Sequence, residues 1–222
     1  IKMGPNSFYR LDGSMIGFTM IAPEVMANIA RYRRELQAVA DTLDIQALPR
    51  NEQLAVWLNL HNVAMVEKIG ENWPIRQPRD IMIDGAPLED ARFITVKDIA
   101  LSPRDIRERI VYAHWKNPAV IYGFWRGEIG GLAVQRAAFD GRDIANQLEM
   151  SAREFVNSRR GTEKRGETMH VSRFYSEAAP FYFADFNRDL RDHLAQHVEG
   201  VMVESLAKTS LIKATIYEHD IA

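Results

Sequence analysis

The chain has 222 residues, a length that fits one large domain or two small ones and can hold a hydrophobic core without disulfides or metals. Its 46% hydrophobic and 26% charged residues are ordinary for a globular protein, and its net charge of −2 argues against a nucleic-acid binder with a basic surface. The absence of cysteine excludes a thiol nucleophile, a cysteine metal site and any disulfide, and leaves the cellular compartment open.

Residues 1–22 are irregular and rich in Gly and Met, so we expect an extended lead-in before one domain over residues 23–222. Residues 1–17 lack a charged start followed by an apolar stretch, so no signal peptide is predicted. No apolar run reaches the length of a membrane span. Because the chain begins at Ile1 rather than at Met, we expect a trimmed product, which leaves open a removed targeting segment.

Two long helices are predicted in the first third of the chain. Over residues 23–44, apolar side chains recur at spacings of three and four and form a stripe that is expected to face the core. The stripe consists of Val25, Ile29, Tyr32, Leu36, Val39 and Leu43. Arg33 lies off it and is expected to be solvated. Residues 51–70, including Leu58 and Val63, are apolar nearly all round, which predicts a helix buried in the middle of the domain.

The middle of the chain predicts short strands and a third helix. Residues 79–98 are expected to contain strands, since Asp84-Gly85 is a turn signal between apolar runs. Ser102 can cap the next helix, and Asp105 can return a hydrogen bond to the cap. The apolar run 118–125 has the length and composition of a strand.

The last third is less regular. Residues 159–168 are polar throughout and are predicted to form a mobile loop, whereas residues 185–198 are predicted to be helical. Ile212, Ala214 and Ile216 alternate with polar residues and predict a half-exposed strand. The elements do not alternate as βαβ units, so we expect an α+β fold, a helix-rich single domain with a small, mainly antiparallel sheet.

The segment Trp57-Leu58-Asn59-Leu60-His61-Asn62 resembles the Trp-Ile-Asn-x-Tyr-Asn segment typical of the uncharacterised family called domain of unknown function 547. Further segments similar to the family's follow in the right order: residues 99–111, residues 117–124, Phe174-Tyr175, Asp185-Phe186 and the terminal strand up to Asp220. The resemblance runs from about Asn51 to the end of the chain.

The departures from the family pattern bear on function. The family has a His on the strand, then Cys-Gly-Ser, then Ser-Cys-Pro, a pattern that implies a thiol-based hydrolase. In this chain the His position falls on Ile121, Cys-Gly-Ser falls on Arg126-Gly127-Glu128, and the second cysteine lies in the neighbourhood of residues 129–132. A thiolate nucleophile needs sulfur, so this chain cannot perform that chemistry.

Three polar residues stand on the predicted buried helix. Asn59 and Asn62 are three apart and share a face, where they either tie loops to the helix by hydrogen bonds or form the polar wall of a pocket. His61 shares a face with Trp57 and stands where the family has Tyr. This position favours a replacement for a buried hydroxyl over a catalytic base.

Two further pairs invite a functional interpretation. Arg126 could clamp a carboxylate or phosphate, or it could form an ion pair with Glu128 and do nothing else, which is the interpretation we favour. His193 and His197 have a spacing that can bind a metal, but no third ligand is indicated, and a solvated helix face is the expectation.

These observations predict a non-catalytic family member that keeps a pocket for a small anionic ligand or a protein partner. The predicted ligand-binding residues are Arg126, Glu128, Asn59, Asn62 and His61. No catalytic residue, metal, cofactor or nucleic-acid partner is predicted. The alternative is a hydrolase of non-thiol type, dependent on a carboxylate, a hydroxyl or a metal held by His193 and His197, so whether the chain is an enzyme stays open.

Overall fold

The computed structural model describes residues 16–216, so most of the predicted lead-in lies outside the described residues. The described α-helices are α1 (Pro23–Thr42), α2 (Arg50–Glu71), α3 (Ile144–Val156), α4 (Arg173–Tyr182), α5 (Phe186–Ala195) and α6 (Val201–Ala207). The strands are β1 (Met82–Ile83), β2 (Ala86–Pro87), β3 (Ile94–Val96), β4 (Ile99–Leu101), β5 (Thr162–Arg165), β6 (Thr168–Ser172) and β7 (Leu211–Ile216). The π-helix η5 (Asp105–Tyr112) and the 3₁₀ helix η6 (Pro118–Gly123) lie between β4 and α3 in the chain.

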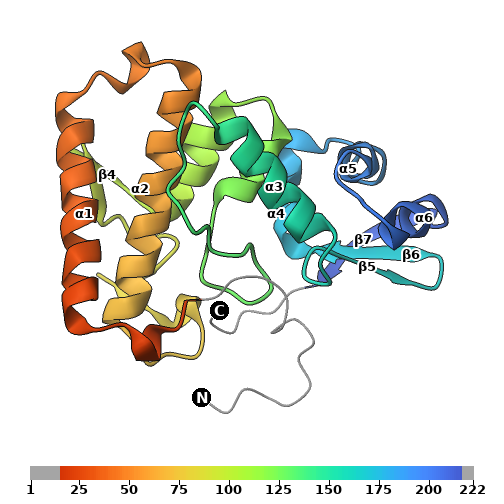
Figure 1. The fold of residues 1–222 in the computed structure, drawn as a ribbon, viewed down its shortest axis with the longest axis horizontal. Helices are drawn as coiled ribbons and strands as arrows, with labels where there is room; N and C mark the ends of the chain where they lie inside the picture. The colour runs from red at the N-terminus through yellow and green to blue at the C-terminus, as the bar shows by residue number, and fades with distance from the viewer. Residues whose placement is uncertain (1–15, 217–222) are drawn as a thin grey trace.

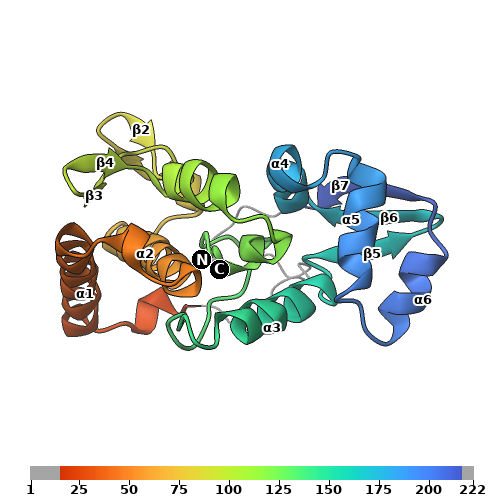
Figure 2. The same ribbon diagram turned by 90° about the horizontal axis from the view of Figure 1, so that it is seen from above.

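The elements form two groups joined by the middle of the chain (Figures 1 and 2). Helices α1 and α2 lie side by side at one end with two antiparallel hairpins, β1–β2 and β3–β4. At the other end α4 and α5 pack against a three-stranded sheet of order β5-β6-β7, α6 lies beside α5, and α3 packs against η6. In that sheet β5 and β6 are antiparallel, and β6 and β7 are parallel. The helix-rich α+β fold is therefore confirmed, with its strands divided among three small sheets.

Helix α2 is the centre of the core, as predicted. Its Leu58 is fully buried. The backbone of η6 crosses α2 so closely that a Cβ added to Gly123 would lie 2.6 Å from Cδ1 of Leu58. Glycine at position 123 thus allows η6 to pack directly against α2, and this contact fixes where the chain emerges at residue 126.

The prediction for the apolar stripe of α1 is wrong in part. Val25, Tyr32 and Val39 of that stripe are exposed. Helix α1 instead turns Arg33 toward α2, where its guanidinium pairs with the buried carboxylate of Glu67. Arg33 is expected to be solvated because it lies off the apolar stripe, but the partner that allows its burial lies on another helix.

Two other segments differ from the prediction. The run 118–125 is not a strand, because Asn117 caps a 3₁₀ helix at its start by accepting a hydrogen bond from Ala119 N (2.9 Å). The segment 159–168 is not an open loop: Arg160 is buried, and β5 pairs with β6 from Thr162 onward. An apolar run alone does not distinguish a buried strand from a buried helix, and a long polar side chain can bury its stem.

Other local predictions are confirmed. Ser102 Oγ accepts a hydrogen bond from Asp105 N (3.0 Å), and Asp105 Oδ2 accepts one from Ser102 N (3.1 Å), which is the reciprocal cap expected at this helix start. The terminal strand β7 buries Ile212 and Ile216 on one side.

Candidate functional site

The segment that carries Arg126 is held by a side chain of α2. Asn62 Nδ2 donates to the carbonyl of Gly123 (2.8 Å), and Asn62 Oδ1 accepts from the backbone N–H of Trp125 (3.1 Å). Asn59, one turn earlier, donates to Phe139 O (2.9 Å) and accepts from Phe139 N (2.8 Å). Both amides thus tie loops to the helix, and Asn62 fixes the backbone one and three residues before Arg126.

His61 lies behind this tie. Because Asn62 Oδ1 is an acceptor, the ring donates from its Nδ1–H (2.9 Å), which leaves Nε2 unprotonated. The ring is fully buried, with its edge on Phe124 at 4.8 Å between centroids. Burial and the nearby positive charge of Arg107 lower its pKa to about 4. His61 is therefore neutral at pH 7 and enclosed.

Three charged side chains meet next to His61. Glu89, which follows the β1–β2 hairpin, accepts from Arg126 Nε at Oε1 (2.7 Å) and pairs with Arg107 Nη2 at Oε2 (2.7 Å). Arg107 comes from η5, and its side chain is 2% exposed. One carboxylate therefore bridges two arginines in the interior, where either arginine alone would be costly to bury.

The electrostatics of this bridge are reciprocal. Burial alone would raise the pKa of Glu89, but Arg107 and Arg126 hold it well below its usual range. Burial alone would lower the pKa of Arg126, but the carboxylates of Glu89 and Glu177 raise it well above the ordinary arginine value. The two groups therefore stay charged at every physiological pH.

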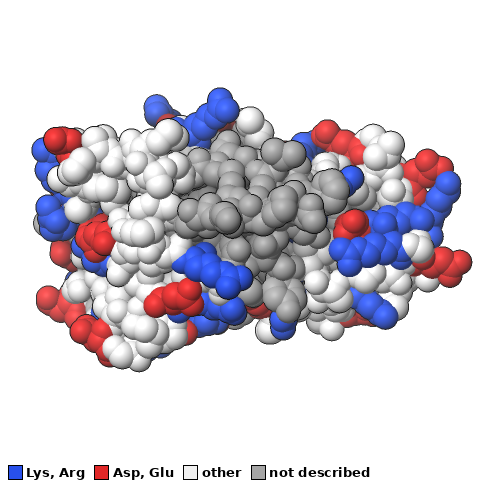
Figure 3. All heavy atoms as spheres, turned by 90° about the horizontal axis from the view of Figure 1, so that it is seen from below, with Lys and Arg blue, Asp and Glu red and all other residues white. Residues whose placement is uncertain are grey.

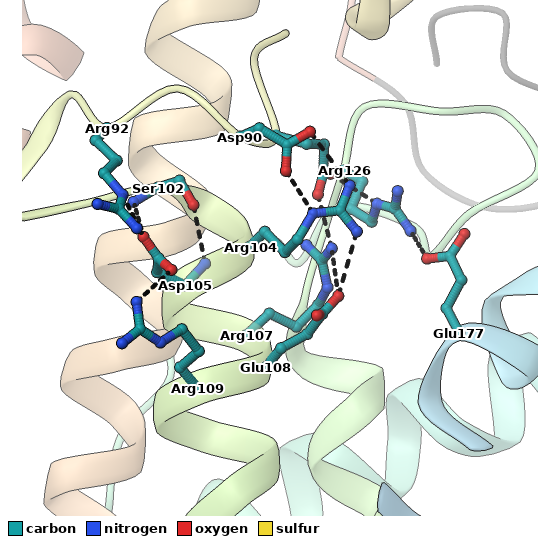
Figure 4. Close-up of polar contacts among 11 residues, drawn as sticks. Asp90, Arg92, Ser102, Arg104, Asp105, Arg107, Glu108, Arg109, Arg126 and Glu177 are labelled. Carbon is teal, nitrogen blue, oxygen red and sulfur yellow. Dashed lines mark hydrogen bonds and ion pairs between the residues drawn. The ribbon is translucent and has the colours of Figure 1, made fainter. Parts of the chain in front are cut away.

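On its outer side Arg126 meets a second carboxylate. Glu177 reaches across from α4, and its Oε2 lies 2.5 Å from Arg126 Nη1 (Figure 4). The side chain of Glu177 is 43% exposed, against 13% for Arg126. The predicted partner, Glu128, lines the same cavity and adds to the negative charge around the guanidinium. The ion pairs drawn to Arg126 thus come from residues distant in the sequence.

A small cavity opens beside this outer pair. Its volume is about 20 Å³, enough for about one water molecule. Its lining combines charged and apolar groups: Phe124, Arg126, Glu128, Gly130, Gly131, Leu132, Ser172, Arg173, Phe174 and Glu177. Arg160 supports one wall by donating from Nη1 to the carbonyl of Gly131 (2.6 Å).

Near Arg107, η5 carries further ion pairs. Arg104 lies between Asp90 (2.6 Å) and Glu108 (3.4 Å), and Figure 4 shows this bridge beside Arg107. Asp105, besides its role in the cap, forms ion pairs with Arg92 and Arg109. These pairs are more exposed and fix η5, which in turn positions Arg107.

The two C-terminal histidines are not on a solvated face. His193 and His197 are each 4% exposed, because α5 and the turn after it pack against the core. His193 Nε2 lies 2.8 Å from the Tyr122 hydroxyl, and His197 Nδ1 lies 3.0 Å from Glu149 Oε2. Within residues 16–216, no group of three or more His, Asp or Glu side chains is placed to hold a metal ion.

The sequence predicted Arg126, Glu128, Asn59, Asn62 and His61 as ligand-binding residues. It missed three charged residues of the ion-pair cluster around Arg126: Glu89, Arg107 and Glu177. Of the five predicted residues, the structure brings Arg126 and Glu128 to the cavity, whereas the other three lie behind it on α2. No local spacing marks the missed residues, since each is paired across a long stretch of chain.

Comparison with known proteins gives a match at the family level. A family model described as "Protein of unknown function, DUF547" matches residues 45–156. This range holds α2, Glu89, Arg107 and Arg126 but ends before Glu177. No curated protein and no solved structure matches the chain significantly.

The surface adds two observations. In the part of the chain that the structure describes, no helix is both long and apolar enough to cross a bilayer. On the face drawn in Figure 3, Lys and Arg are interspersed with Asp and Glu over the described residues at both ends.

Proposed function

We propose that this chain, which belongs to the DUF547 family of proteins of unknown function, is a non-catalytic member that binds a small anion beside Arg126. One observation carries the proposal: the guanidinium at the cavity already holds a carboxylate, that of Glu177, at hydrogen-bond distance. Arginine is suited to carboxylate and phosphate because its planar donors match their oxygens and its charge is permanent.

The residues at the family's reactive positions support a non-catalytic role. Ile121, at the position of the family's His, is fully buried and cannot accept a proton. Arg126, at the position of the Cys-Gly-Ser cysteine, cannot act as a nucleophile. His61 is the nearest imidazole on α2, but it is enclosed and its remaining lone pair faces the interior. General acid–base catalysis requires contact with a substrate, which an enclosed ring does not have.

Burial of Arg126 strengthens its attraction for an anion that reaches it. Anions bind more strongly to a guanidinium that is withdrawn from bulk water, since screening is weaker there. Arg126 is mostly buried, but it lines the cavity together with the half-exposed Glu177. The backbone at Gly130 and Gly131 presents no side chain there, so a ligand can approach closely.

Calorimetric titration with acetate tests the proposal. We expect the native protein to bind acetate weakly and Arg126→Gln to lose that binding. A matched control is Arg142→Gln, which removes an exposed arginine that is also paired with a carboxylate, Asp140. Circular dichroism should show that all three proteins are folded.

Two results would contradict the proposal. Equal acetate binding by native protein and Arg126→Gln would make Arg126 structural. Hydrolysis of an ester or peptide substrate by the native protein, abolished in Arg126→Gln but kept in Arg142→Gln, would refute the non-catalytic role.

A further inference from the structure

The two carboxylates on Arg126 differ in how firmly they are held. Glu89 is enclosed and is bridged by Arg107 on its other oxygen. Glu177 projects from α4, is 43% exposed, and meets Arg126 through one oxygen. A half-exposed carboxylate that leaves its partner is rehydrated at once, whereas an enclosed one is not. The outer pair is therefore the one that can open without disturbing the interior.

Glu177 neutralises the outer side of Arg126, whose inner side is paired with Glu89. When Glu177 swings out, the outer side of the guanidinium loses its carboxylate. One carboxylate from a ligand replaces the charge that has left. A dianion would add a further negative charge near Glu89 and Glu128 in a poorly solvated site, which is unfavourable.

The space beside Arg126 and Glu177 also restricts the size of the ligand. The cavity of about 20 Å³ is too small for a whole ligand, so the head group has to take the position that the Glu177 carboxylate occupies. Phe124, Leu132 and Phe174 line the cavity beyond it. A short apolar stem on the ligand would contact these side chains and be withdrawn from water.

We infer that Glu177 is the chain's own occupant of the anion site, and that the ligand is a small monocarboxylate with a short apolar stem that displaces it. This inference rests on the proposed function and names its ligand class and its gate. Glu177 lies outside the range that the family model matches, so the gate comes from α4 and not from the matched region.

The test compares Glu177→Ala with the native protein by calorimetric titration with propionate and with sulfate at constant ionic strength. Removing the internal carboxylate should tighten propionate binding at least tenfold and leave sulfate binding weaker than propionate binding. Glu204→Ala is the matched control, because Glu204 is also a helical, exposed glutamate in an ion pair, here with Lys208. It should bind propionate as the native protein does. Adding Arg126→Gln to Glu177→Ala should abolish the gain.

Each contrary outcome has its own meaning. If Glu177→Ala is folded and binds propionate no more tightly than the native protein, Glu177 is not the occupant, although acetate binding that depends on Arg126 would still support the proposed function. If sulfate binds as tightly as propionate, the monocarboxylate class is wrong. If neither protein binds any of these anions, the proposed function itself fails.

Discussion

Two buried polar clusters flank the same short segment of chain and achieve stability in opposite ways. At residue 126 the cluster is charged, with Glu89 between Arg107 and Arg126. Four residues earlier the cluster is neutral: the Tyr122 hydroxyl meets His193 Nε2 at 2.8 Å and the Tyr175 hydroxyl at 3.3 Å. Both clusters are withdrawn from water, but only the first contains formal charges.

The pKa shifts express this contrast. In the charged cluster, opposite charges overcome burial and keep Glu89 ionised. In the neutral cluster burial dominates, so the pKa of His193 falls to about 3 and the pKa of Tyr122 rises. Burial of polar groups is thus tolerated either by pairing charges or by suppressing them. The two solutions predict different responses to mutation and to pH.

The largest expected effect is on the charged cluster. Glu89→Ala leaves Arg107 and the inner side of Arg126 without their shared carboxylate, and breaking such a buried pair costs about 3–5 kcal/mol of unfolding free energy. Urea denaturation measures the loss. Glu204→Ala, which breaks an exposed pair, should change stability by less than about 0.5 kcal/mol. A loss below 1 kcal/mol for Glu89→Ala would show that the bridge contributes little.

The apolar contact that holds both clusters in place comes next. Leu58 packs against Gly123, between Tyr122 and Arg126, and Leu58→Ala should cost roughly 2–5 kcal/mol because it leaves a cavity in the centre of the core. Val63 on the same helix was expected to be equally buried, but it is only half-buried, so Val63→Ala should cost less in the same denaturation experiment. Equal losses for the two variants would contradict this ranking.

Local signals in the sequence predicted three features correctly. The buried helix α2, the reciprocal cap of Ser102 and Asp105, and the alternating β7 all depend on residues close together in the chain. The prediction of a strand over residues 118–125 was wrong because a buried 3₁₀ helix is as apolar as a buried strand. The prediction of a mobile loop over residues 159–168 was wrong because polar composition does not reveal that β5 pairs with β6.

The sequence predicted two residues that line the cavity, Arg126 and Glu128, but not the ion-pair partners of Arg126. Arg126 was found through the family pattern, but its partners are 37 residues earlier and 51 residues later. Ion pairs over such separations leave no periodic spacing in the sequence. His193 and His197 show the same limit: their spacing suggested a helix face, but packing against Tyr122 decided which face.

Acid should weaken the protein through its buried histidines. Well above pH 6.5 the imidazoles are neutral in both folded and unfolded chains. As the pH falls below 6.5, the unfolded chain takes up protons, whereas His61 and His193, with pKa values of about 4 and about 3, do not. The unfolding free energy therefore falls by up to about 1.4 kcal/mol per pH unit for each of them.

Urea denaturation between pH 6.5 and 5 measures this slope, in a range above the ordinary pKa of glutamate. The variant His193→Gln should reduce the slope by about one proton. An unchanged slope in a folded His193→Gln protein would mean that His193 titrates alike in the folded and unfolded states, contrary to its burial.

The smallest expected effect separates the two hydroxyls of the neutral cluster. Tyr175→Phe removes a hydroxyl whose bond to Tyr122 is long, at 3.3 Å, and leaves the bond between Tyr122 and His193 intact. The loss should be about 0.5–1.5 kcal/mol, the usual net value of one neutral hydrogen bond. Tyr122→Phe should cost more, since it also deprives buried His193 Nε2 of its partner. Neither change should alter acetate binding, because the Arg126 corner keeps its charges. A larger loss for Tyr175→Phe than for Tyr122→Phe in the same denaturation experiment would show that Tyr175, and not Tyr122, organises the neutral cluster.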